Sequence, residues 1–203
     1  MSDDLVRLSK RLSWLLRHGA GEAQLDMDEA GWTGIEQVLR VLGVTRSQLD
    51  RAVQLNDKGR LVIEGSRVRA CQGHSLQGMP VTVEGLEASW ELVHPSTALW
   101  HGTKISAADG IASAGILPGT RTHVHLAPDP GSRVGKRGSN DLLLEISPAS
   151  LASEDLQVFR APNGVLLTRH VPVSAITGVL AVSKAGESGA EHARRAFKLV
   201  DRT

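Results

Sequence analysis

The chain has 203 residues, of which 41% are hydrophobic and 22% charged, values typical of a globular protein with one large core or two small ones. A formal net charge of +1 excludes a polybasic, histone-like surface, so any nucleic-acid binding must come from a local patch. The single cysteine, Cys71, excludes an internal disulfide framework, and no apolar run suits a membrane span or a signal peptide. We therefore expect a cytoplasmic protein with no membrane partner.

The N-terminal residues predict an amphipathic helix with a basic side. Leucines spaced three and four residues apart form its apolar stripe. Gly19 and Gly21 are typical of a helix stop, which places Arg17 and His18 in the last turn, where the helix dipole favours cations. The leucines of the stripe are Leu5, Leu8, Leu12, Leu15 and Leu16.

Two further helices and a β-hairpin follow. The segments Thr33-Gly-Ile-Glu36 and Thr45-Arg-Ser-Gln48 both match a capping box ahead of apolar positions. Residues 59–70, "GRLVIEGSRVRA", read as two strands rich in Val and Ile with a tight turn between them. Three helices and a hairpin are typical of a winged-helix module, which we place at residues 1–78. Weak periodicity and turn residues predict a linker at residues 79–95.

Residues 96–203 predict a second domain with an α+β fold on a small, largely antiparallel core. One short helix begins at the capping residue Ser106 and ends at Gly115. The Gly-, Ser- and Ala-rich stretch from Lys184 to Ala190 reads as a loop before a terminal segment. The predicted strands are "ALWH", "HVHLA", "LLLEI", "LQVF", "GVLLT" and "ITGVLAV".

Two kinds of catalytic site are weakly supported by the sequence. Cys71 stands three residues before His74, but neighbours in sequence need not bring their side chains together, so a nucleophilic thiol is not favoured. His123 and His125 share one face of a strand and His101 could join them around zinc, but no cysteine pair or HExxH spacing supports a metal site. Hydrogen-bonded strand histidines are the simpler interpretation, and we expect no metal.

Arginines are the residues best suited to a phosphate site in this chain, which has no Walker loop and no GxGxxG motif. A guanidinium stays charged at physiological pH and binds two phosphate oxygens through its planar fork. Arg17 precedes His18 at a helix end, Arg69 lies shortly before His74, and Arg121 precedes the "HVHLA" strand. Each alone reads as a surface charge, but their combination indicates a phosphate site.

The sequence resembles the NAD-dependent RNA 2′-phosphotransferases, a family known from removal of the 2′-phosphate at the tRNA splice junction. The resemblance spans Leu8 to Thr168, with its segments in the family's order. It implies a winged-helix lobe that binds RNA and an ADP-ribosyltransferase-like lobe that binds NAD, with the active site in the cleft between them. The matching segments are "LSKRLSWLLRH", "RACQGHS", "LWHGT", "RTHVHLA", "VGKRGS" and "NGVLLT".

The resemblance also implies roles for individual residues. NAD would serve as co-substrate, an RNA with an internal 2′-phosphate would be the partner, and we expect a monomer. Lys136 and Arg137 could contact NAD phosphates or RNA, although solvated loop charges are the simpler explanation. The implied catalytic residues are Arg17, His18, Arg69 and Arg121; the implied NAD contacts are His101, Gly102 and Thr103; and His74 and Ser75 would border the phosphate. His101 could instead be a structural histidine at a strand end, and a turn-stabilising role explains His74 and Ser75 about as well.

The implied reaction has two steps. The RNA 2′-phosphate attacks the anomeric carbon of the nicotinamide ribose of NAD, and nicotinamide leaves. The ribose 2″-hydroxyl then attacks the phosphate and releases 2′-OH RNA and ADP-ribose 1″,2″-cyclic phosphate. Two alternatives stay open: transfer of ADP-ribose to a terminal nucleic-acid phosphate, and a winged-helix nucleic-acid binder whose second lobe reads ADP-ribose or NAD without catalysis.

Overall fold

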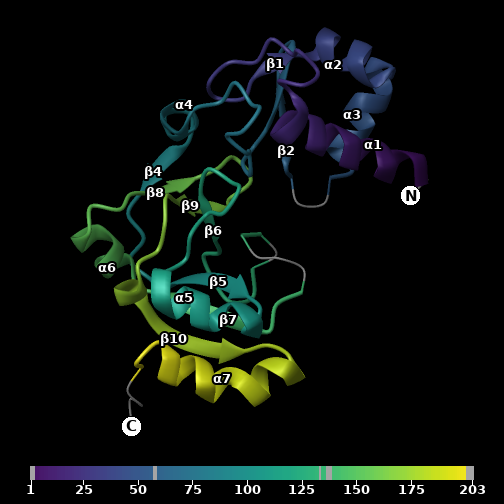
Figure 1. The fold of residues 1–203 in the computed structure, drawn as a ribbon. Helices are drawn as coiled ribbons and strands as arrows, with labels where there is room; N and C mark the ends of the chain where they lie inside the picture. Colours follow the sequence, from purple (N-terminus) through teal and green to yellow (C-terminus); the bar gives the residue numbers. More distant parts are fainter. Residues whose placement is uncertain (1–2, 57–58, 133, 136–138, 200–203) are drawn as a thin grey trace. The chain divides into compact units, whose positions relative to one another are not determined.

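The structure is a computed structural model that describes residues 3–56, 59–132, 134–135 and 139–199 (Figure 1). Its helices and several small antiparallel sheets agree with the α+β class expected from the sequence. Contacts between Cα atoms divide the chain into two compact units. Unit 1 comprises Met1–Glu91, Thr120–Thr122 and Ala161–Asn163, and unit 2 comprises Leu92–Gly119, His123–Arg160 and Gly164–Thr203.

The helices of unit 1 begin with the predicted amphipathic helix. It forms α1 (Asp3–Trp14) and continues into a π-helical turn at Leu15–Gly19. The leucine stripe is confirmed, since all its members are buried except the half-buried Leu5. α1 packs against α3 (Arg46–Gln54), which follows α2 (Ile35–Leu42).

One of the two predicted capping boxes is confirmed and the other is wrong. The Thr45 side chain accepts from the Gln48 backbone N–H, and the Gln48 side chain bonds back to the backbone of Thr45. Thr33 instead forms the short strand β1 (Thr33–Gly34) and pairs with Val68, so α2 begins after Gly34 without a side-chain cap. Sheet pairing holds Thr33 in an extended conformation and overrides the local capping signal.

The predicted hairpin is confirmed as β2 (Leu61–Glu64) and β3 (Arg67–Ala70), and the sheet of unit 1 has the strand order β1-β3-β2. The segment 79–95, predicted as a linker, contains α4 (Val83–Ala88), which is capped by the Thr82 side chain, and β4 (Glu91–Val93). The division between the two units falls within this segment, after Glu91.

Unit 2 contains two sheets, in which β5, β7 and β10 pair antiparallel, as do β6, β8 and β9, and all six strands predicted for it are confirmed. The first sheet has the order β10-β7-β5 and the second the order β4-β8-β9-β6. The strands are β5 (Leu99–Thr103), β6 (Val124–Leu126), β7 (Leu142–Ile146), β8 (Val158–Arg160), β9 (Leu166–Thr168) and β10 (Ile176–Ala181).

The helices of unit 2 differ from the sequence prediction at two places. Ser106 lies inside a 3-10 turn and caps nothing, while α5 (Ala108–Ala114) ends at Gly115 as predicted. The loop predicted at Lys184–Ala190 is wrong, because this stretch forms α7 (Lys184–Ala196). The Ser183 side chain caps α7, and its small buried residues let the helix lie close against β10 (Figure 1). A short α6 (Pro148–Ser153) was not predicted.

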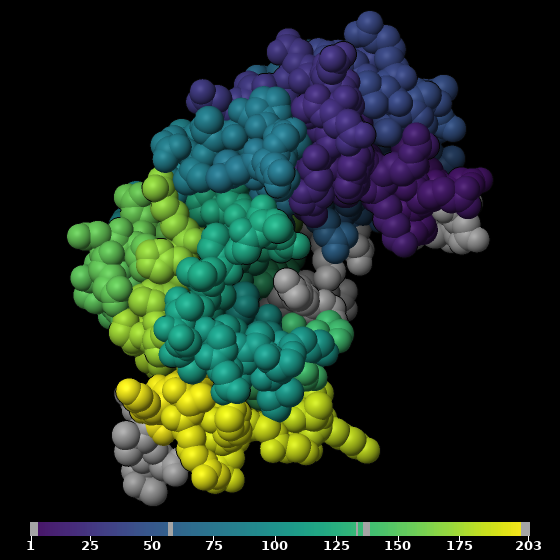
Figure 2. All heavy atoms as spheres, in the orientation of Figure 1, coloured from purple at the N-terminus to yellow at the C-terminus, as the bar shows by residue number. Residues whose placement is uncertain are grey.

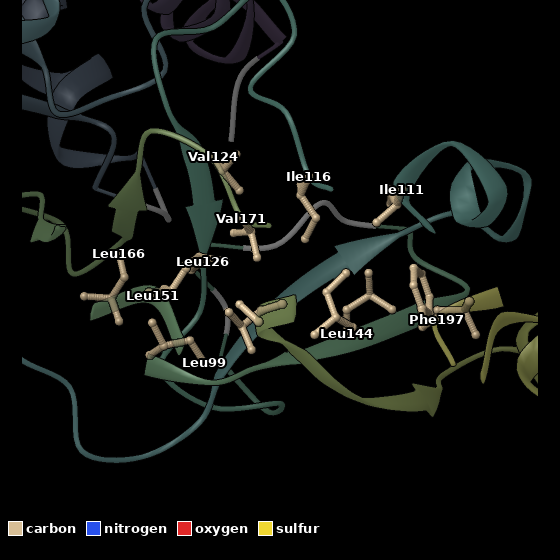
Figure 3. Packing of buried hydrophobic residues seen from close by; sticks show 14 of the residues in the cluster. Leu99, Ile111, Ile116, Val124, Leu126, Leu144, Leu151, Leu166, Val171 and Phe197 are labelled. Carbon is tan, nitrogen blue, oxygen red and sulfur yellow. The ribbon is translucent and has the colours of Figure 1, made fainter. Parts of the chain in front are cut away.

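An apolar cluster of buried side chains forms much of the core of unit 2. Figure 3 shows Leu99 and Leu144 from the first sheet in the same cluster as Leu126 and Leu166 from the second. Phe197, just beyond α7, is buried in this cluster, so α7 belongs to the core and not to a surface tail. Figure 2 shows the opposite side of α7 as an exposed yellow ridge. Among the described helices, none is both long and apolar enough to cross a bilayer.

Candidate functional site

The π-helical turn at Leu15–Gly19 carries two of the predicted site residues. A π turn is wider than an α turn and is frequent at functional sites. Its last residues include Arg17 and His18, as the sequence predicted for the last turn of this helix. Leu15 and Leu16 are buried beneath them, so the turn is fixed to the core while Arg17 is half-buried and His18 is exposed.

Backbone and side-chain bonds join this turn to two other segments of unit 1. The Ser75 N–H donates to the Arg17 carbonyl at 3.1 Å, and Nδ1 of His18 lies 3.3 Å from Oγ of Ser75. Ser75 also forms an isolated antiparallel bridge with Arg121, next to a 3.0 Å bond from the Thr122 N–H to the His74 carbonyl. The structure therefore brings together Arg17, His18, His74, Ser75 and Arg121.

The guanidinium of Arg17 has hydrogen-bond donors that an anion could accept from. Its Nε and Nη2 atoms are buried and have no hydrogen-bond partner among the described residues, and none of the described carboxylates forms an ion pair with it. It lies against Gly73, where an added Cβ would fall 3.6 Å from Cζ of Arg17. Gly73 has a φ of 88°, a conformation that L residues with a side chain rarely adopt, so glycine permits this turn.

Positive charges surround Arg17. Its pKa is lowered to about 10 by burial, by Arg60 and by Arg121, and is raised slightly by the Cys71 thiol. The pKa of His18 is lowered by burial, by Arg17 and by Arg121, so His18 is neutral at pH 7. An anion bound here would relieve the repulsion between these groups.

Arg60 is a site residue that the sequence analysis missed. Among the neighbouring charges, it has the largest effect on the pKa of Arg17. Arg60 precedes β2, and its carbonyl accepts from the Cys71 N–H at 2.8 Å. The register of the predicted hairpin could have placed Arg60 opposite the start of the "CQGHS" turn, because a tight turn fixes which residues pair.

Arg69 lies in a different environment from Arg17. It is 4% exposed, and its Nη1 donates to the Ala30 carbonyl at 3.2 Å and to Oγ of Ser89 at 2.6 Å. Its Nη2 donates to the Ser89 carbonyl at 3.4 Å, and its Cζ lies 4.7 Å from the centroid of the Trp32 ring. These contacts tie two loops to β3 and use donors on Nη1 and Nη2, while Nε of Arg69 is buried and has no hydrogen-bond partner among the described residues.

Two other residues near this turn are buried. His74 is 0% exposed, and an added Cβ at Gly31 would fall 2.9 Å from its Nε2. Burial raises the pKa of the Cys71 thiol to about 11, against the lowering effect of Arg69 and Arg17. The thiol donates to the Gly59 carbonyl at 3.2 Å. A neutral, buried thiol is a poor nucleophile, which agrees with the sequence interpretation that did not favour Cys71 as a nucleophile.

The predicted NAD contacts lie on β5 in unit 2. Nδ1 of His101 lies 3.0 Å from the His125 carbonyl, which can only accept, so Nδ1 carries the proton of this hydrogen bond. Gly102 and Thr103 are buried, and an added Cβ at Gly102 would overlap the Asn140 side chain. This arrangement holds the ring of His101 in one orientation.

The other residues considered from the sequence are placed as follows. Lys136 and Arg137 lie outside the described residues. The rings of His123 and Phe159 pack edge to face with centroids 6.5 Å apart. In the described part of the chain, no three side chains of the His, Cys, Asp or Glu types come together in an arrangement that could hold a metal ion.

Comparisons with known proteins identify relatives over most of the chain. Residues 3–170 match the family described as "RNA 2'-phosphotransferase, Tpt1 / KptA family". A "Probable RNA 2'-phosphotransferase" from Streptomyces coelicolor is 34% identical over 174 residues, covering 82% of this chain and 91% of the relative. A protein of the same name from Burkholderia lata is 35% identical and covers 83% of this chain and 88% of the relative. Another from Pseudomonas syringae pv. tomato is 33% identical and covers 85% of this chain and 93% of the relative.

Proposed function

This chain belongs to the RNA 2′-phosphotransferase, Tpt1/KptA family, and from that membership we propose how its residues transfer an RNA 2′-phosphate. One observation carries the proposal: the Arg17 guanidinium has two buried nitrogens with no hydrogen-bond acceptor in the described part of the chain, beside two further arginines. A phosphate dianion supplies both the acceptors and the negative charge that this cluster lacks.

NAD is the co-substrate that the family uses, and we assign its binding to His101, Gly102 and Thr103. The His125 carbonyl accepts from Nδ1 of His101 and fixes its ring, which we propose contacts a ribose hydroxyl or the nicotinamide amide. Gly102 has no side chain to compete for space beside Asn140. These features fit a ligand that presents hydroxyl and amide groups.

The first chemical step needs positioning more than acid or base. A 2′-phosphate oxygen forms a bond to the anomeric carbon of the nicotinamide ribose as the bond to nicotinamide breaks, and nicotinamide leaves as a neutral molecule. Arg17 and Arg121 hold the phosphate dianion at the attacking distance. The transition state has oxocarbenium character, but the glycosidase carboxylate pair is unnecessary because the RNA brings its own nucleophile.

The second step places the greater demand on the arginines. The ribose 2″-hydroxyl forms a bond to phosphorus and loses its proton, while the RNA 2′-oxygen leaves and gains one. Negative charge builds at phosphorus, and clustered guanidinium groups stabilise it. His18 is neutral in the free protein, but a bound phosphate raises its pKa, so His18 can protonate before it donates to the departing RNA oxygen.

The third phosphate ligand has two candidates. The resemblance assigns Arg69, but Arg69 would have to release Ala30 and Ser89 to reach a phosphate. Arg60 is half-buried, and its charge acts directly on Arg17. We therefore propose Arg60 beside Arg17 and Arg121, and the assignment of Arg69 stays a prediction that its own substitution tests. Ser75 positions His18 through their contact, and His74 holds the turn that carries Ser75.

The finer fold assignment is part of the same proposal. In unit 1, α1 to α3 accompany a hairpin, which supports a winged-helix lobe for RNA over residues 1–78, followed by a linker at 79–95. Two antiparallel sheets with the NAD residues on β5 support an ADP-ribosyltransferase-like lobe over residues 96–203. We further propose that the protein acts as a cytoplasmic monomer.

A single incubation tests the function against its alternatives. The protein is mixed with NAD and an RNA that carries one internal 2′-phosphate, and we expect nicotinamide, 2′-OH RNA and ADP-ribose 1″,2″-cyclic phosphate in equal amounts. A 5′-phosphorylated oligonucleotide without a 2′-phosphate serves as the control. ADP-ribose retained on that control alone would favour terminal ADP-ribosylation. Binding of both substrates with no turnover of either would favour a non-catalytic reader.

A further inference from the structure

A groove on unit 1 lies next to the π turn and has no role in the chemistry assigned above. It runs between α1 and the end of α2 and encloses about 520 Å³. Small-ligand sites typically enclose about 300–1,000 Å³, so one nucleotide base would fit. Among its lining residues are Lys10, Arg11, Trp14, Gly19, Val41 and Leu42.

The floor of this groove is an indole ring with an open face. Trp14 is 52% exposed, although it follows a stripe of buried leucines. Its ring lies on the backbone of Gly19, where an added Cβ would fall 2.7 Å from Cη2 of Trp14. A π turn brings residue i+5 over residue i, so the turn itself places Gly19 over Trp14. Glycine at this position lets the ring lie flat against the chain and fixes its orientation.

The charges around the ring suit a polyanion. Lys10 and Arg11 are exposed, and Arg11 reaches across the groove to donate to the Leu42 carbonyl at 3.4 Å. Neither cation forms an ion pair with a carboxylate among the described residues. Glu22 also lines the groove and is the one negative group facing the two cations in its described lining. The purple surface of α1 is exposed on the face drawn in Figure 2.

The groove adjoins the proposed phosphate site along the chain, because Gly19 lines it and directly follows His18. Gly19, which supports the ring, is bonded to His18, and consecutive Cα atoms are about 3.8 Å apart. The ring therefore lies on the backbone of the residue that follows His18, one of the residues assigned to the 2′-phosphate. An aromatic face with flanking cations is the usual way in which proteins hold an unpaired nucleotide without reading its sequence.

We propose that Trp14 stacks on the base of an RNA nucleotide that neighbours the 2′-phosphorylated one, while Lys10 and Arg11 contact the phosphates beside it. This inference rests on the proposed function, because it assumes that the 2′-phosphate binds at Arg17. The stack fixes the strand and so contributes to the affinity for RNA, not to the bond-making steps. It also sets a minimum substrate length, since the stacked base must be present.

Steady-state kinetics with RNAs of two lengths test the proposal. The substrates are a single-stranded oligonucleotide with an internal 2′-phosphate and a nucleotide that carries a 2′-phosphate with no neighbour. Trp14→Leu should raise the KM for the oligonucleotide about tenfold, the range found for loss of one stacked base, and leave its kcat and the KM for NAD unchanged. Trp14→Phe should retain most of the affinity. The lone nucleotide should react equally with all three proteins.

Further variants separate stacking from folding and from the proposed function. Leu55→Ala removes an exposed apolar side chain of unit 1 outside the groove lining and should leave all constants unchanged. Glu22→Gln should lower the KM for the oligonucleotide, most clearly at low salt. A wild type that transfers phosphate with a KM insensitive to Trp14→Leu overturns the stacking proposal alone. A wild type that transfers no 2′-phosphate overturns the proposed function, and oligonucleotide binding by quenching of indole fluorescence then still tests the stack.

Discussion

Arg17 should make the free protein less stable than an apolar side chain of similar length would, and Arg17→Met tests this. The guanidinium is partly buried among other cations, and two of its nitrogens find no acceptor in the described part of the chain. Methionine is unbranched and fills similar space with no charge. Replacing an uncompensated buried charge with an apolar group of similar volume commonly stabilises a fold.

The size of the effect follows from the pKa of Arg17, which burial and the neighbouring arginines lower to about 10. At about 1.4 kcal/mol for each pKa unit, the charged form costs about 3 kcal/mol in the fold relative to the unfolded chain. The lowered pKa means that the unfolded chain holds this proton more tightly, so the cost is complete at every pH below about 10 and disappears only above the higher pKa of the unfolded chain. Water screens part of this cost at a half-buried side chain, so we expect Arg17→Met to gain about 1–2 kcal/mol.

Thermal unfolding in a buffer without phosphate or sulfate measures the gain. In a chain of this size, 1 kcal/mol raises Tm by about 2–4 °C. The matched control is Arg40→Met, since Arg40 is exposed on α2 and should shift Tm little. Added inorganic phosphate should stabilise the wild type by mass action and leave Arg17→Met unaffected. A lower Tm for Arg17→Met, with no response of the wild type to phosphate, would refute the idea that the guanidinium awaits an anion.

Three further predictions concern other residues. The pKa of His18 should lie below 6.5 in the free protein and rise when inorganic phosphate is added, as measured by NMR titration of the ring; a pKa that phosphate leaves unchanged would contradict the donor role. Arg60→Ala should slow the second chemical step about a hundredfold, so that RNA carrying 2′-phospho-ADP-ribose accumulates on a gel, whereas Arg69→Ala should mainly lower Tm. Accumulation of the same intermediate by a stably folded Arg69→Ala, with Arg60→Ala fully active, would reverse the two assignments. Ser183→Ala removes the cap of α7 and should cost about 1 kcal/mol in the free energy of unfolding; an unchanged Tm would show that the cap contributes nothing.

Local signals in the sequence predicted most of the regular structure. The leucine stripe of α1, the Thr45 capping box and the hairpin each depend on residues within one or two turns of one another. Such signals can be recognised in a sequence because burial and hydrogen bonding recur at fixed spacings along a helix or a strand. Thr33 carried the same kind of signal and failed, because β3 supplies a pairing partner from a distant part of the chain.

The loop predicted in place of α7 shows where composition misleads. Glycine and serine have poor helix propensity, so the stretch from Lys184 to Ala190 reads as a loop. The helix forms because small residues permit close packing: an added Cβ at Gly186 would overlap the Asp141 carbonyl. The Ser183 cap also supports the helix. A prediction from local composition does not include tertiary packing, and here tertiary packing determines that the stretch is helical.

The sequence allowed us to predict which residues belong to the candidate site better than how their side chains are arranged. Arg17, His18, Ser75 and Arg121 were predicted, and the structure joins them. Nothing local shows which way an arginine on β3 points, and the contacts of Arg69 with Ala30 and Ser89 come from segments far away in the chain. Arg60 was missed for a different reason, because the register of the predicted hairpin was not followed one residue further, where Arg60 pairs with Cys71.

Ser75 supports the helix end that carries Arg17 and His18, although it lies far from them in the sequence. The last carbonyls of a helix have no partner within it, and one of them, that of Arg17, accepts from the Ser75 N–H. This bond fixes the "CQGHS" turn beneath the helix end and places Oγ of Ser75 beside His18. The negative end of the helix dipole favours the cationic side chain of Arg17, which partly offsets its crowding with Arg60 and Arg121. A bound phosphate would neutralise the positive charge that remains. The repulsion among the arginines therefore lowers the stability of the free protein and raises its affinity for the phosphate.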